Sequence, residues 1–118
     1  MAVEVVREYY RANPAAPVSL PAAARLVGKS PSRLSHLFRA QLGASFQETV
    51  IRIKLAHGAS LLRRRPPLSV KEVAVAVGYD DQLYFSRLFR NYCGSAPSEA
   101  RRGGGKPLKV TPARRSAI

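Results

Sequence analysis

The 118-residue sequence has no tryptophan, a single cysteine, and only 7 acidic residues against 20 lysines and arginines. Cys93 alone cannot form an internal disulfide, and one cysteine with two separated histidines, His36 and His57, lacks zinc-ligand spacing. No apolar run approaches the ~20 residues that span a bilayer, and the N-terminus lacks the segments of a secretory signal. These absences exclude disulfide scaffolds, zinc fingers and membrane proteins, and they predict a cytoplasmic protein with no metal and no cofactor.

The charge that is present has one dominant sign. The formal net charge is +13, and a surface this positive predicts a polyanionic partner. Hydrophobic residues make up 46% of the chain, which is enough for a packed core. A wholly disordered basic tail is therefore excluded.

The apolar pattern predicts an all-α fold, because apolar residues recur at helical spacing and no stretch alternates for long. Proline, glycine and capping residues divide the chain into about seven helices. We expect two helix-turn-helix units, a homeodomain-like pair, joined by a longer helix over Phe46 to Leu62 that a capping box at Ser45 to Glu48 opens. The first unit and the linking helix occupy residues 1–62 and the second unit 63–102, whereas the basic segment 103–118 is predicted to be a disordered tail.

An internal repeat carries the helix-turn-helix prediction. At an offset of 50 residues Ala24–Gly28 matches Ala74–Gly78, and at an offset of 51 Leu37–Arg39 matches Leu88–Arg90. Each copy consists of a short helix, a turn with glycine, and a second helix with an apolar inner face. A helical bundle with repeated hairpins would show the same pattern, so the repeat alone favours neither interpretation.

The outer faces of the two second helices favour DNA. The residues at helical spacing on these faces are polar or basic except for one leucine: Ser32, Ser35, His36 and Arg39 in the first unit and Leu83, Ser86, Arg87 and Arg90 in the second. Arginine can bond guanine, Gln82 can bond adenine, and an exposed Leu83 can touch a thymine methyl group. A merely solvated face would not explain Leu83.

Two motifs resemble the AraC/XylS family of bacterial transcription regulators. They are Ser30–Arg39 and Val77–Arg87, and the second continues into Phe89-Arg90 and Gly94–Pro97. The resemblance covers about residues 3 to 102. It implies binding of double-stranded DNA by two recognition helices, about 31–41 and 81–92, in successive major-groove segments, with RNA polymerase as a further candidate partner.

The effector-binding and dimerisation domain that precedes this module in most of the family has no counterpart in the 118 residues. Sugar sensing is therefore not assigned. Two alternatives stay open: the chain is a stand-alone monomeric regulator, as a minority of the family are, or it is the DNA-binding part of a longer protein. We expect a monomer for the isolated domain, and a dimer if the domain is part of a longer protein.

The resemblance also predicts which residues contact the DNA bases and which contact the phosphates. The family's base-facing positions fall on Ser32, Ser35, His36, Gln82, Leu83 and Arg87. Phosphate contacts are expected from Ser30, Arg33, Arg39, Asp81, Ser86 and Arg90, since phosphates take most protein–DNA hydrogen bonds.

The sequence departs from the family at four places. Lys54 stands where arginine is usual and Gly58 where alanine is usual, and the loop from Arg63 to Leu68 has one extra residue. These three are expected to alter the relative tilt of the two units. Ala100 replaces an aromatic residue, which is expected to weaken docking of the last helix.

Two other classes of function compete with DNA binding. An enzyme is disfavoured, because neither histidine has an orienting partner or a nucleophile in view. A basic RNA-binding protein is the serious alternative, since a charge of +13 attracts any nucleic acid. The chain lacks an evident surface on which RNA bases could stack, because the candidate aromatic residues fall mainly on predicted core faces: Phe38, Tyr84, Phe85 and Phe89.

Overall fold

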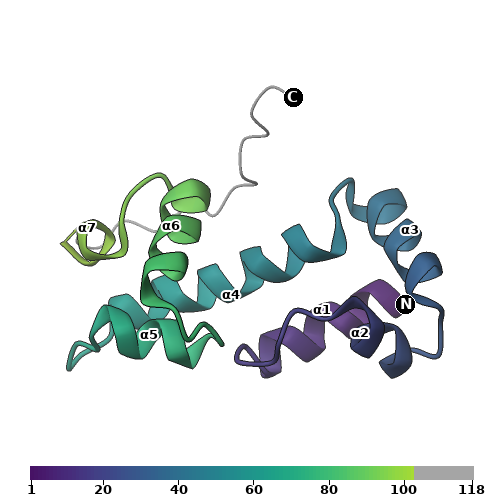
Figure 1. The fold of residues 1–118 in the computed structure, drawn as a ribbon, viewed down its shortest axis with the longest axis horizontal. Coiled ribbons are helices and arrows are strands. Elements are labelled where there is room, and N and C mark those ends of the chain that lie inside the picture. Colours follow the sequence, from purple (N-terminus) through teal and green to yellow (C-terminus); the bar gives the residue numbers. More distant parts are fainter. Residues whose placement is uncertain (103–118) are drawn as a thin grey trace.

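The computed structural model describes residues 1–102, which form seven α-helices and no strand (Figure 1). The helices are α1 (Ala2–Ala12), α2 (Leu20–Leu26), α3 (Pro31–Leu42), α4 (Phe46–Leu62), α5 (Val70–Ala76), α6 (Gln82–Cys93) and α7 (Pro97–Arg102). The all-α prediction is confirmed, and the linking helix has the predicted bounds. The tail predicted at residues 103–118 lies outside the described residues.

Capping residues begin the helices where the sequence predicts. The Ser45 hydroxyl accepts from the Glu48 backbone N–H at 3.0 Å, and the Glu48 carboxylate accepts from the Ser45 N–H at 3.1 Å. Ser69 and Glu72 form the same reciprocal pair at the start of α5. Each pair satisfies two backbone donors that a helix start otherwise leaves unpaired, so α4 and α5 begin at defined residues.

Two hydrophobic cores share α4. The first core joins α1, α2 and α3 to the start of α4, and the second joins α5, α6 and α7 to the rest of it. We call α1–α3 the first unit and α5–α7 the second unit. The largest fully buried apolar side chains of the first core include Tyr10, Leu34 and Phe38, and those of the second include Leu55, Phe85 and Phe89. Helix α4 contributes side chains to both cores. The division of the chain into two units at residue 62 stays a prediction.

Gly58 lies where the second unit packs on α4. A Cβ atom built on Gly58 would lie 3.4 Å from Phe85 Cζ and 3.5 Å from Val73 Cγ1. Side chains of α5 and α6 therefore lie beside α4 at Gly58, at a distance that would leave room for a Cβ atom. This contact holds the second unit against the linking helix.

The last helix docks on the second core despite the small residue at position 100. Ala100 is buried, and the Arg101 guanidinium donates to the carbonyl oxygen of Leu68. The weakening expected from the missing aromatic ring stays a prediction. Within residues 1–102, none of the helices has the length and apolarity needed to cross a membrane.

Candidate nucleic-acid interface

The two predicted recognition helices, α3 and α6, lie near opposite ends of α4 (Figure 1). The molecule measures 42 × 32 × 24 Å along its principal axes. Two helices that enter successive major-groove segments on one face of B-DNA must lie about 34 Å apart. The longest dimension accommodates that separation within a single chain.

Helix α3 separates a buried face from a polar one. Leu34 and Phe38 are fully buried in the first core, which fixes the rotation of the helix about its axis. Ser32, His36 and Arg39 are exposed, and Ser35 is half-buried. The Ser30 hydroxyl accepts from the Arg33 backbone N–H at 3.1 Å and caps the helix.

Helix α6 repeats this arrangement in the second unit. Phe85 and Phe89 are fully buried, whereas Gln82, Arg87 and Arg90 are exposed and Ser86 is half-buried. Leu83 is 71% exposed. Leu83 is therefore a large aliphatic side chain that faces solvent in the first turn of α6.

Asp81 is occupied in capping α6. Its carboxylate accepts the backbone N–H groups of Leu83 at 2.9 Å and of Tyr84 at 3.2 Å. A carboxylate at a helix N-terminus is stabilised by the helix dipole, and here it fixes the first turn that carries Gln82 and Leu83.

The sequence prediction was wrong about Tyr84, which it placed mainly on a core face. It is 40% exposed rather than in the core, because it lies about 100° around the helix from Phe85, whose ring fills the core position. The Arg87 guanidinium carbon lies 6.0 Å from the Tyr84 ring centroid, within cation–π range. The i, i+3 spacing of Tyr84 and Arg87 is the sequence signal that could have shown this pair.

The described part of the chain is itself strongly basic. Residues 1–102 hold 16 of the 20 basic residues and all 7 acidic ones, a net charge of 16 − 7 = +9. Arg33 and Arg39 on α3 and Arg87 and Arg90 on α6 are exposed. These positive charges favour a polyanion at both recognition helices.

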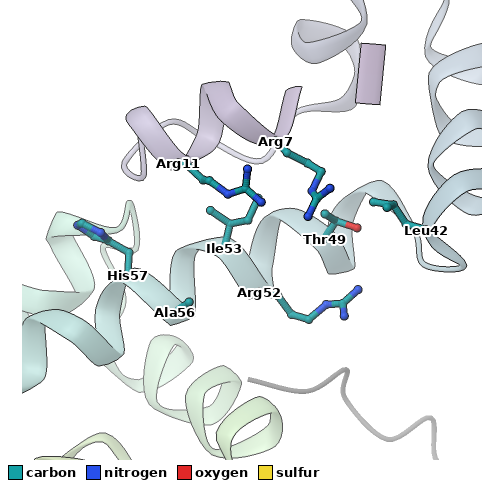
Figure 2. Close-up of a pocket in the computed structure, with 8 residues that line it drawn as sticks. All are labelled: Arg7, Arg11, Leu42, Thr49, Arg52, Ile53, Ala56 and His57. Carbon is teal, nitrogen blue, oxygen red and sulfur yellow. The ribbon is translucent and has the colours of Figure 1, made fainter. Parts of the chain in front are cut away.

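A separate groove of about 630 Å³ lies between α1 and α4 (Figure 2). Figure 2 shows Arg7 and Arg11 extending from α1 towards α4, which contributes Arg52 and His57. Arg7 and Arg11 form ion pairs with Glu4 and Glu8 on α1. None of the predicted base- or phosphate-contacting residues lines this groove. No group of three or more His, Cys, Asp or Glu residues that could hold a metal occurs within residues 1–102.

Known proteins resemble this chain in sequence and in fold. The helix-turn-helix domain family matches residues 23–103. The HTH-type transcriptional regulator GlxA of Rhizobium meliloti is 38% identical over 89 residues, which are 75% of this chain and 27% of that protein. The arabinose operon regulatory protein of Escherichia coli K12 is 47% identical over 74 residues, 63% of this chain and 25% of that protein. The chain thus spans about a quarter of the length of these curated relatives.

The fold agrees with the sequence comparison. The C-terminal domain of AraT, a response regulator from Geobacillus stearothermophilus, superposes with a TM-score of 0.78 at 32% identity, covering 86% of this chain and 84% of that one. The family comprises DNA-binding domains of transcription regulators rather than enzymes. The repeated units, the two polar recognition helices and these matches agree: the chain belongs to the AraC/XylS family of helix-turn-helix DNA-binding domains.

Proposed function

We propose that this chain binds double-stranded DNA in a sequence-specific way, with α3 and α6 in successive major-groove segments, and that it serves in bacterial transcription regulation. The observation that carries the proposal is the pair of helices that bury aromatic residues on one face and expose polar and basic residues on the other. Two such helices at opposite ends of one rigid connecting helix suit two segments of one duplex.

Base contacts come from the outer faces near the helix starts. On α3 these are Ser32, Ser35 and His36, which can bond base edges. On α6 the contacts are Gln82, Leu83 and Arg87. The stacking of Arg87 on Tyr84 supports its role, since a guanidinium oriented by an aromatic ring loses less freedom when it bonds guanine.

Phosphate contacts position the helices. Arg33, Arg39 and Arg90 supply exposed positive donors. The hydroxyls of Ser30 and Ser86 can each donate to a phosphate oxygen, since the Ser30 oxygen accepts from the Arg33 N–H and keeps its own proton for donation. Asp81 serves the phosphate side indirectly, by capping α6 so that its first turn is ordered at the DNA.

The remaining parts of the proposal rest on family membership. The isolated domain binds as a monomer in the cytoplasm, and as a dimer if it is part of a longer protein. RNA polymerase is the second macromolecular partner, in keeping with a regulator of transcription.

Selection of sites from random duplex DNA at about physiological salt tests this proposal, because charge alone gives binding without sequence preference. We expect two conserved segments about one helical turn, roughly 10 bp, apart. Binding without enrichment of any sequence would contradict the proposal and favour the RNA-binding alternative.

The selected site then tests the division of roles between base and phosphate contacts. Arg87→Ala should cost about 1–3 kcal/mol of binding free energy on that site and relax discrimination at one position. Arg39→Ala should weaken binding to all sequences to a similar extent. Fluorescence anisotropy on the selected site and on scrambled DNA separates the two effects, and identical behaviour of the two variants would refute the assignment.

A further inference from the structure

Lys54, in the middle of α4, is a buried charge that DNA contact does not explain. Its side chain is 1% exposed. Within residues 1–102 it is the one charged residue in the buried class. Burying an ammonium group is unfavourable unless all its N–H groups find acceptors, so its surroundings must compensate.

The ammonium group joins the first unit to the second. Lys54 Nζ donates to the carbonyl oxygen of Pro14 and to that of Ala16, both in the loop between α1 and α2. It also donates to the carbonyl oxygen of Val77, the residue that ends α5, at 3.1 Å. An ammonium has three N–H donors, and here all three go to backbone carbonyls.

Each unit also supplies one aromatic ring to the cation. Lys54 Nζ lies 5.7 Å from the ring centroid of Tyr10 in the first unit and 5.9 Å from that of Tyr79 in the second. Both distances are within cation–π range. The cation is thus held by groups from both units, which have separate cores.

The backbones of the two units meet beside Lys54. A Cβ atom on Gly78 would lie 2.7 Å from the carbonyl oxygen of Ala15 and 3.2 Å from Lys54 Nζ. In Figure 1 the loop after α1 and the end of α5 approach each other along α4. The second unit's turn at Gly78 therefore lies directly against the Ala15 carbonyl group in the first unit's loop, next to the Lys54 ammonium.

We propose that Lys54 is a positioning residue that fixes the orientation of the two helix-turn-helix units, and thereby the spacing of DNA segments that α3 and α6 read together. The proposal rests on the proposed function. If one unit rotated about α4, Lys54 would lose either its two loop carbonyls or Val77, and a buried charge would be left short of acceptors. The three bonds thus select one relative orientation.

A merely stabilising role would lower stability without changing which spacing is preferred. The readout that separates the two roles is the dependence of affinity on the number of base pairs between the two selected segments. Affinity for a duplex with one segment reports whether each unit is folded and competent.

The experiment compares the wild-type chain, Lys54→Met, and the control Lys71→Met on duplexes with one segment and with both, the spacer being varied one base pair at a time. Lys71 is an exposed lysine on α5, so the control removes the same charge without touching the junction, that is, the contact between the Pro14–Ala16 loop and Val77 that Lys54 bridges. We expect Lys54→Met to keep wild-type affinity for one segment. It should lose about tenfold on both segments at the best spacing, the cost of a lost charged hydrogen-bond set, and its preference for that spacing should flatten.

Folded Lys54→Met with the wild-type spacing preference would overturn the proposal. If Lys54→Met loses its helical circular dichroism signal, Lys54→Arg decides, because a planar guanidinium cannot direct three N–H groups as an ammonium does. A shifted or broader spacing optimum would then support the proposal, and an unchanged one would overturn it. If the wild-type chain gains nothing from the second segment, the proposed function fails before Lys54 is tested.

Discussion

Two equivalent glycines of the internal repeat differ in what a side chain would meet. Gly28 and Gly78 each end the first helix of a helix-turn-helix unit, with φ of +68° and +93°. A Cβ on Gly28 would have no atom within 4 Å among residues 1–102, whereas one on Gly78 would lie 2.7 Å from the Ala15 carbonyl oxygen. The pair Gly28→Ala and Gly78→Ala therefore isolates the contact between the two units.

The expected magnitudes follow from these contacts. Alanine in a left-handed conformation costs about 1–2 kcal/mol, so Gly28→Ala should lower the free energy of unfolding by about that amount. Gly78→Ala carries the same penalty, and overpacking against backbone that must shift adds about 1–3 kcal/mol. The loss of chain entropy in the unfolded state is the same for both substitutions and cancels in the difference.

Urea denaturation followed by circular dichroism measures both values, since a lower midpoint at an unchanged denaturant slope reports a loss of stability. Gly78→Ala should be less stable than Gly28→Ala by at least about 1 kcal/mol. Equal destabilisation by the two substitutions would refute the close approach of the α1–α2 loop to the end of α5, and with it the junction around Lys54.

Three further predictions concern α4 and α6. Gly58→Ala should stabilise the protein by about 1 kcal/mol, because alanine favours a helix interior and its Cβ meets Phe85 and Val73 at ordinary contact distance. A lowered melting temperature would contradict this prediction and show that the Phe85 ring cannot move to accommodate the methyl group. Burial lowers the pKa of Lys54 to about 8, from 10.5, so between these pH values the unfolded state binds more protons and the stability contribution of Lys54 rises with pH. The free energy of unfolding of the wild-type chain relative to Lys54→Met should therefore increase by about 2 kcal/mol from pH 7 to 9.5, below the range where Tyr10 and Tyr79, whose pKa values are raised, titrate in the folded chain. A decrease would contradict this sign. Burial raises the pKa of the Cys93 thiol to about 11, so at pH 8 it should react with a disulfide reagent far more slowly in the folded than in the unfolded chain, and equal rates would contradict its burial.

Most of the fold could be predicted because its signals are local. A capping box and the residues around it defined α4 from Phe46 to Leu62. The inward rows of α3 and α6 followed from helical spacing, and the exposure of Leu83 agrees with its predicted place on the outer face. Each of these features depends on residues within one or two helical turns.

The junction at Lys54 could not be predicted in the same way. Its acceptors are backbone carbonyls 38 and 40 residues before it and 23 after it, and a carbonyl carries no residue-specific signal. The sequence marked Lys54 only as a departure from the family that would affect the tilt of the units. The contact that gives this idea a mechanism exists only in the folded chain.

Methylation interference on the selected site tests most directly whether α3 and α6 both enter the major groove of one duplex, since guanine N7 faces that groove. We predict two clusters of guanines whose methylation prevents binding, about 10 bp apart. A single cluster would contradict simultaneous use of the two recognition helices.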